Sequence, residues 1–295
     1  MIMSDANATS ATRAATPPPA APQKAPGYLS AAVRIMDLSI GQMLWSRRTV
    51  FMALVVLGPV LISLFVRLLV GLGLPVGEVN GVRMAGPAMF GLIIWIFYLR
   101  FTVPVLGVFY GTALIADEVD DKTIPYLFSR PIPRGAVLLG KYLAYLVATG
   151  FVVLPSVSIV YLLIVPIGGS LGGSFLDFAK DLLLLAVGLA VYGALFAFIG
   201  AWFRRPLLIG LVFIFGWEQA ALAFPGYLKR FTVAYYLQGL VPHAMPQDSI
   251  LSLVQSIVRE SPTLGSSILW LAVIWTAALY LAAYWVERRE YVLDQ

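Results

Sequence analysis

Three observations predict that this chain is an all-α polytopic membrane protein with six transmembrane helices. First, 60% of its 295 residues are hydrophobic and only 12% are charged, with a mean hydropathy of +0.88. Soluble domains carry about 45–50% apolar and about 25% charged residues. Second, six apolar stretches are each long enough to cross about 30 Å of hydrocarbon as a helix. Third, these stretches lack the polar–apolar alternation of membrane-barrel strands.

The composition also narrows the chemistry. The chain has no cysteine and one histidine, so it lacks the ligand sets of zinc and iron–sulfur sites and has no thiol nucleophile. We expect no metal site, no catalytic residue and no cofactor bound by this chain. An intramembrane enzyme is a poor alternative for the same reason.

Two short motifs resemble catalytic signatures but lack their context. Residues 135–142 (GAVLLGKY) match a phosphate-binding loop except at the last position, where tyrosine replaces the Ser or Thr that holds magnesium. They also open an apolar stretch instead of following a strand. Residues 168–172 (GGSLG) match a serine-nucleophile pattern, but His243, the one histidine, lies in another loop. Neither motif indicates bond chemistry in this chain.

The N-terminal residues divide into a tail and a helix. Residues 1–27 are rich in alanine and proline, and we expect a disordered tail because such a segment cannot pack a core. In residues 28–48, apolar residues recur at helical spacing with polar residues between them. This pattern predicts an amphipathic helix that lies in the membrane interface. Its apolar positions are Val33, Met36, Ile40, Met43 and Leu44.

Residues 49–295 form the predicted six-helix transmembrane domain. With the N-terminus inside, the cytoplasmic segments hold twelve Lys and Arg residues and the external segments hold four. Because cytoplasmic loops carry the excess of Lys and Arg, both termini are predicted to be cytoplasmic. The net charge of +5 then reflects topology, and we expect no nucleic-acid partner. The six stretches lie near Val50–Leu72, Pro87–Ala116, Ala136–Val165, Lys180–Phe203, Pro206–Phe224 and Ser266–Val286.

Two loops are long. The external loop 225–265 carries apolar residues at helical spacing in FTVAYYLQGLVPH and DSILSLVQSIVRE. We expect short helices there, which dip back toward the lipid or cap a central path. The cytoplasmic loop 117–135 combines an acidic cluster with the apolar pair Leu127-Phe128 and a proline-stiffened exit. This pattern favours a short amphipathic helix that docks into a groove of a soluble partner, although an ordinary solvated loop is the simpler alternative.

The cytoplasmic loop and its flanks resemble the membrane subunits of type-2 ABC exporters, the ABC-2 permeases. The matching positions are Asp117-Glu118, Thr123, Leu127, Ser129, Pro131, Arg134 and Gly140-Lys141. Lys122 replaces the glycine that is usual before the threonine. The resemblance also covers the interfacial helix, the six spans, the cytoplasmic termini and the long last external loop.

The resemblance implies an assembly of two permease subunits, expected to be a homodimer, with two cytoplasmic ABC ATPase subunits in the cell inner membrane. ATP and Mg²⁺ would bind to the ATPase. Loop 117–135 would contain the coupling helix, with Glu118 as its chief acidic anchor and with Ile124, Leu127 and Phe128 filling the apolar contact. The predicted ATPase-coupling residues are Asp117, Glu118, Asp121, Thr123, Ile124, Leu127, Phe128 and Arg134.

Two charged residues lie near the middle of apolar stretches. Arg100 is in the second stretch and Glu218 is in the fifth. An unpaired charge at the bilayer centre costs at least about 2.5–3.5 kcal/mol, so such residues pair or line a wet cavity. In the resembled family the second and fifth spans line the path at the dimer interface. We expect Arg100 and Glu218 to pair or share a polar cavity there, with Tyr110 and Gln219 contributing; a purely structural ion pair is the alternative.

The leading interpretation is therefore the membrane-spanning permease subunit of an ATP-driven ABC-2 type exporter, which forms the substrate path and couples to a separate cytoplasmic ATPase. The alternative is an ATPase-independent membrane protein, either a secondary transporter or a membrane scaffold. An inverted repeat between the first and last three spans would favour a secondary transporter, and none is evident in the sequence.

Overall fold

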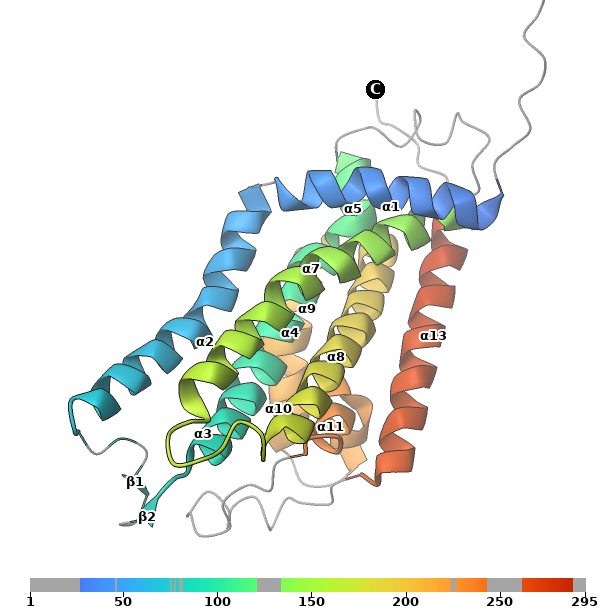
Figure 1. Ribbon diagram of the computed structural model, residues 1–295. Coiled ribbons are helices and arrows are strands. Elements are labelled where there is room, and N and C mark those ends of the chain that lie inside the picture. Colours follow the sequence, from blue (N-terminus) through green and yellow to red (C-terminus); the bar gives the residue numbers. More distant parts are fainter. Residues whose placement is uncertain are drawn as a thin grey trace, which may run out of the picture.

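The computed structural model describes residues 27–45, 47–74, 76, 78–79, 82–120, 134–223, 227–242 and 262–288. These residues are helical apart from short connections and one hairpin of two short strands (Figure 1). Except for Gly27, the predicted tail 1–27 lies outside the described residues. So does the predicted external segment DSILSLVQSIVRE.

Helix α1 (Tyr28–Leu44) lies across one end of a bundle of long helices, as Figure 1 shows. Helix α2 (Arg47–Gly71) follows at once, so the predicted interfacial helix 28–48 ends before Arg47 and Arg48. The chain then forms the antiparallel hairpin β1 (Glu78–Val79) and β2 (Val82–Arg83). We call the end of the bundle that carries α1 the α1 end, and the end near this hairpin the opposite end.

A second long helix returns to the α1 end and contains two π-helical parts. It consists of α3 (Gly86–Ile93), η1 (Ile94–Thr102), α4 (Val103–Leu106), η2 (Gly107–Gly111) and α5 (Ala113–Asp120). Pro104 has no N–H to donate to the carbonyl group four residues earlier, so the regular α-helical ladder is interrupted there. The N–H of Val103 instead donates to the carbonyl of Tyr98, five residues earlier. The wider turns of η1 accommodate this irregularity.

The remaining helices complete the bundle. Helices α7 (Arg134–Ile164), α8 (Phe175–Trp202) and α13 (Leu264–Arg288) each run along the bundle (Figure 1). Between α8 and α13 the chain forms α9 (Pro206–Val212), the π-helical η3 (Phe213–Glu218), α10 (Gln219–Ala223), the 3₁₀-helical η4 (Tyr227–Phe231) and α11 (Val233–Gln238). Helix α11 lies in the first part of the segment 225–265.

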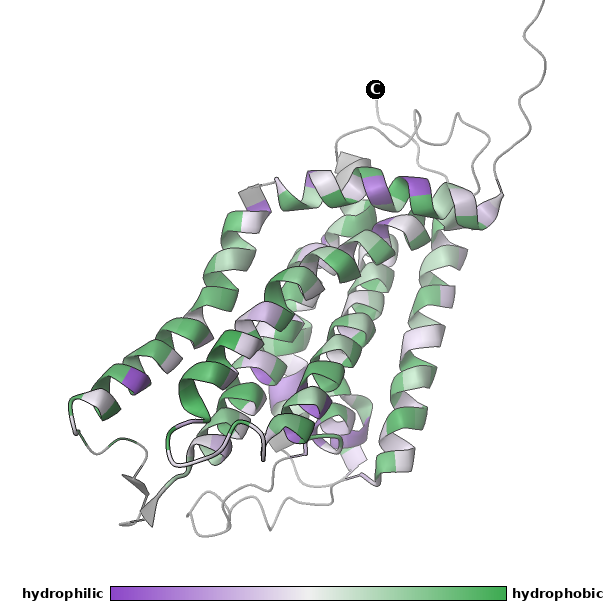
Figure 2. Ribbon diagram, viewed as in Figure 1, coloured by the Kyte–Doolittle hydropathy of each residue, from purple (hydrophilic) through white to green (hydrophobic). Residues whose placement is uncertain are grey.

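Five helical segments are long and apolar enough to span a membrane: Arg48–Gly71, Gly86–Ala116, Gly135–Ile164, Phe175–Trp202 and Leu264–Arg288. They agree closely with five of the six predicted spans. The predicted fifth span, Pro206–Phe224, corresponds to a shorter apolar helix over Pro206–Ala221. Part of this segment is π-helical, and a π turn holds more residues than an α turn, so it advances less along its axis. Figure 2 shows hydrophobic residues along the long helices and hydrophilic residues gathered on α1.

Both described ends of the chain lie at the α1 end. The start of α1 and the last turn of α13 meet at Gly135, where an added Cβ would lie 3.0 Å from the Tyr28 hydroxyl oxygen and 3.1 Å from Glu287 Oε1. Burial and the nearby Glu287 carboxylate raise the pKa of the Tyr28 hydroxyl above its usual value. This arrangement brings the first and the last described helices together at the α1 end of the bundle.

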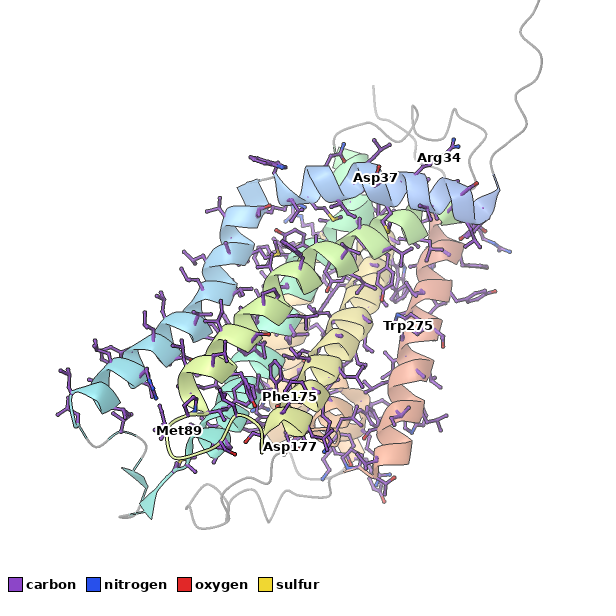
Figure 3. The ribbon with its side chains drawn as sticks, in the orientation of Figure 1. Arg34, Asp37, Met89, Phe175, Asp177 and Trp275 are labelled. Carbon is purple, nitrogen blue, oxygen red and sulfur yellow. The ribbon has the colours of Figure 1, made fainter. Side chains whose placement is uncertain are left out.

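Helix α8 packs at the centre of the bundle because glycines on it admit its neighbours. An added Cβ at Gly193 would lie 2.1 Å from the ring of Tyr145, and one at Gly200 would lie 2.4 Å from the carbonyl oxygen of Thr112. Hydrogen bonds reinforce these contacts. Trp275, which lies on the side of α13 that faces α8 (Figure 3), donates to the Tyr142 hydroxyl at 2.7 Å, and that hydroxyl donates to the Ala190 carbonyl at 2.8 Å.

We expect Gly200→Val to lower the free energy of unfolding by about 3 kcal/mol, the upper part of the range for overpacked cores. The new side chain would meet backbone atoms of Thr112, which cannot move aside as a flexible side chain can. Thermal unfolding of the purified protein measures the change. Gly150→Val is the matched control, since no described atom lies within 4 Å of an added Cβ there. Equal melting temperatures for the two variants would contradict this packing.

Candidate functional site

Glu218 is the centre of a buried polar cluster near the opposite end of the bundle. Its side chain is 2% exposed and accepts hydrogen bonds from three donor groups. The Tyr192 hydroxyl of α8 lies 2.9 Å from Oε1 and 2.7 Å from Oε2. The backbone N–H groups of Val233 and Ala234 donate to Oε1 at 3.2 and 3.4 Å. Glu218 therefore joins three segments that are far apart in the sequence: η3, α8 and α11.

The position of Glu218 at the start of α11 explains how a carboxylate is tolerated there. The first N–H groups of a helix have no partner within the helix, and the helix dipole favours negative charge at that end. Thr232 caps the same helix: its hydroxyl accepts from the Tyr235 N–H at 3.3 Å and donates to the Lys229 carbonyl at 2.7 Å. Glu218 and Thr232 together satisfy the first turn of α11.

Arg100 also lies next to α11. It is partly buried, and its guanidinium carbon is 5.1 Å from the centre of the Trp95 ring, within the range of a cation–π contact. It borders a small cavity together with Trp95, Leu99, Ala234, Leu237 and Gln238. Arg100 and Glu218 are near enough to interact electrostatically. No ion pair within 4 Å joins them among the described residues, so they share a neighbourhood without forming a direct pair.

The other two predicted path residues lie elsewhere. Tyr110 is buried near the α1 end, close to the side chains of Arg48 and Thr49 of α2. Gln219 follows Glu218 directly but is exposed on the surface of α10. The structure therefore brings Arg100 and Glu218 together and leaves Tyr110 and Gln219 outside their cluster.

Three of the four predicted path residues share a type of backbone. Arg100 is in η1, Tyr110 is in η2 and Glu218 ends η3, and all three segments are π-helical. π-Helical turns are rare and occur frequently at functional sites. No apolar periodicity in the sequence indicates them.

The predicted ATPase-coupling residues are described only in part. Asp117 and Glu118 belong to the end of α5, and Arg134 opens α7, although the positions of their side chains lie outside what the structure describes. Asp121, Thr123, Ile124, Leu127 and Phe128 lie outside the described residues altogether. Both flanks of the loop are at the α1 end of the bundle (Figure 1).

Next to this loop, α1 and α7 approach each other closely. Ala31, Ala32 and Ala136 form a small buried cluster between the two helices. An added Cβ at Gly140 would lie 2.5 Å from the carbonyl oxygen of Ala32 and 2.8 Å from Cβ of Ile35. Gly140 of the motif thus serves helix packing. On the far side of α1, Arg34 and Asp37 point away from the bundle (Figure 3).

The catalytic-looking motifs of the sequence also have structural explanations. Gly140 belongs to the α1–α7 contact and not to a phosphate loop. Gly168 has a φ of +72°, which suits a glycine in the turn between α7 and α8. His243 lies outside the described residues. Among the described residues, no group of three or more His, Cys, Asp or Glu side chains could hold a metal ion.

Tyr192 and the start of α11 were not predicted from the sequence as partners of Glu218. Tyr192 lies directly before Gly193 in a stripe of small residues on α8, where a large polar side chain stands out. Thr232 before VAYYLQ is a helix N-cap signal, which indicates unpaired N–H groups just after it. These two signals identify candidate partners, but nothing in the sequence relates them to Glu218.

Comparison with known proteins identifies the family. The family model described as ABC-2 family transporter protein matches residues 6–291, which is nearly the whole chain. No curated protein matches the chain. The match confirms the resemblance seen in the 117–141 segment, and the long apolar helices agree with a multi-pass membrane protein. The chain belongs to the ABC-2 transporter family and is a membrane-spanning permease component of an ABC transporter.

Proposed function

We propose that this chain is the permease subunit of an ATP-driven exporter in the cell inner membrane, where two identical copies form the substrate path. A separate cytoplasmic ATPase, also in two copies, binds ATP and Mg²⁺ and supplies the energy. The observation that carries the proposal is the family match over residues 6–291, which includes the coupling motif.

A sixth crossing of the membrane is part of the proposal. At the end of α8, Trp202 stacks on Trp285 of α13 with ring centres 5.8 Å apart, at the α1 end. Near the start of α13, Tyr236 of α11 stacks on Trp270 at 6.2 Å. The segment α9–η3–α10 connects these two ends, which supports its assignment as a short fifth crossing. Both termini are then cytoplasmic, in agreement with the distribution of Lys and Arg.

The coupling surface of the proposal consists of α1, the end of α5 and the start of α7. Because Gly140 lets α1 contact the α7 backbone, these helices form one packed unit. An ATPase that pushes on loop 117–135 would move this unit as a body and tilt the helices beneath it.

The buried charges have separate roles in the proposed path. The hydrogen bonds that Glu218 accepts from three donor groups favour a structural role, in which it ties α11 to η3 and α8. Arg100 has no ion pair among the described residues, so it is the better candidate of the two for contact with an anionic cargo.

We expect Glu118→Arg to abolish co-purification of the ATPase with the permease. Reversal of the charge would replace attraction to basic groups of the ATPase with repulsion. The measurement is the ratio of ATPase to permease after affinity capture of the permease. Asp177→Arg is the matched control: it reverses an exposed acid at the opposite end (Figure 3). Capture of the ATPase by both variants in the parent ratio would overturn this coupling surface.

A further inference from the structure

A large cavity at the α1 end has a charged rim and an apolar wall. Its volume is about 640 Å³, and it lies between the first turns of α2, the end of the second long helix and the start of α9. Its arginine rim consists of Arg48, Arg204 and Arg205. Its apolar wall consists of Phe51, Phe109, Ala113, Ala116, Leu207 and Leu208.

The arginine rim brings together positive charges from distant parts of the sequence. Arg48 comes from α2, whereas Arg204 and Arg205 lie in the turn between α8 and α9. All three are exposed, and the part of the chain that the structure describes contributes no acidic side chain to the cavity lining. Guanidinium groups bind phosphate oxygens with paired, charge-assisted hydrogen bonds.

The apolar wall suits a hydrocarbon chain. Phe51 and Phe109 pack together with ring centres 4.3 Å apart, which makes a continuous aromatic surface between α2 and the second long helix. Leu207 and Leu208 are 39% and 54% exposed. The Thr112 hydroxyl donates its hydrogen bond to the Val108 carbonyl, so Thr112 adds little polarity to this surface.

A second cavity among the described residues has an apolar wall but lacks the arginine rim. It has a volume of about 560 Å³, lies between α8 and α13, and is lined by apolar residues with Lys180 as its charged member. Lys180 is already paired with Asp177 at 2.9 Å. That cavity therefore has an apolar wall without a cationic rim.

We propose that the cavity at the α1 end binds one anionic phospholipid, whose phosphate contacts the arginine rim and whose upper acyl chain lies on the apolar wall. Its volume falls in the range of ordinary ligand pockets, about 300–1,000 Å³, which accommodates a headgroup and the first part of a chain. Basic pockets between membrane helices bind anionic headgroups by the same chemistry. The site does not depend on the transported cargo or on the proposed coupling to an ATPase.

Native mass spectrometry of the full-length chain in neutral detergent tests the proposal. Phosphatidylglycerol is expected to bind at least about tenfold more tightly than phosphatidylcholine, because the choline cation of the latter repels the rim. The double variant Arg204→Gln/Arg205→Gln should lose at least about tenfold in affinity for phosphatidylglycerol. Arg34→Gln is the matched control, since Arg34 is exposed at the same end but points away from the bundle (Figure 3).

Two further arms separate a shaped lipid site from simpler explanations. Ala113→Phe narrows the cavity while the rim keeps its charge, and it should weaken phosphatidylglycerol binding as well; its melting temperature checks that it folds. Glycerol 3-phosphate, which has the headgroup chemistry without acyl chains, should not compete. The proposal is overturned if the rim variant binds phosphatidylglycerol like the parent, if Arg34→Gln loses as much affinity, if Ala113→Phe has no effect, or if glycerol 3-phosphate displaces the lipid.

Discussion

Replacement of Glu218 by alanine is expected to release α11 from the bundle and to lower the free energy of unfolding by about 3 kcal/mol. The substitution leaves the Tyr192 hydroxyl and the N–H groups of Val233 and Ala234 buried without their acceptor. Each buried group that loses its partner costs about 1–3 kcal/mol, and the methyl group of alanine replaces none of these bonds. Glu218→Gln keeps an acceptor oxygen in place and should recover part of the loss.

Hydrogen exchange and unfolding measurements check this expectation together. Amide exchange in α11 should speed up in Glu218→Ala, because its first turn is no longer held. A double-mutant cycle with Tyr192→Phe should give a coupling free energy of about 1.5–3 kcal/mol, the range for a hydrogen bond to a charged group. Gln219→Ala, next to Glu218 but exposed, is the control. Parent-like exchange of α11 in Glu218→Ala would show that this carboxylate does not hold the helix.

Gly140→Val is expected to separate α1 from α7 and to interrupt the transmission of ATP-driven motion. An added Cβ would lie 2.5 Å from the Ala32 carbonyl oxygen, whereas non-bonded heavy atoms approach to about 3.5 Å, so the helices must move apart by about 1 Å. Since α1 lies at the surface of the bundle, it can shift outward while the fold survives. Gly140→Val should therefore reduce the coupling of ATP hydrolysis to transport more than it lowers the free energy of unfolding.

Distance measurements between spin labels check this separation. Because the chain has no cysteine, Leu38→Cys on α1 and Val147→Cys on α7 provide two specific labelling positions, and both residues are exposed. In the parent assembly we expect the same α1–α7 distance with and without ATP. In Gly140→Val we expect a longer distance that varies with ATP. The control is Gly150→Val, where an added Cβ has open space. A parent-like distance in Gly140→Val would refute the rigid α1–α7 unit.

Apolar run lengths predicted the long helices, because the cost of exposing backbone polar groups to lipid forces a helix wherever a stretch spans the membrane. The same reasoning predicted the segment Pro206–Phe224, which is helical from Pro206 to Ala223, but it did not predict the π-helical part. Hydropathy counts residues, but the length of a helix also depends on its hydrogen-bond pattern, and η3 bonds as a π-helix. The predicted end of the interfacial helix, residue 48, was too late for a different reason. Arg47 and Arg48 begin the next helix instead of ending the first.

The candidate site was predictable only as single residues. The cost of burying charge identified Arg100 and Glu218 from the sequence. Their partners depend on how distant helices pack: Glu218 meets Tyr192 because η3 lies against α8, and it meets Val233 because α11 folds back. Tyr110 was assigned to the same path by its position in the second span, but the length of that helix places it near Thr49 instead.

The most apolar parts of α2 and α8 have equal mean hydropathy, yet 28% of this part is buried in the bundle in α2 and 61% in α8. Their glycines record the difference: added Cβ atoms at Gly58 and Gly71 of α2 meet open space, and those at Gly193 and Gly200 of α8 collide with neighbours. A saturation mutagenesis map should consequently show two different patterns of tolerance. Along most of α2, whose side chains face away from the bundle, apolar residues should replace one another without loss of folded protein. Along α8, the size of the side chain should decide whether the protein folds.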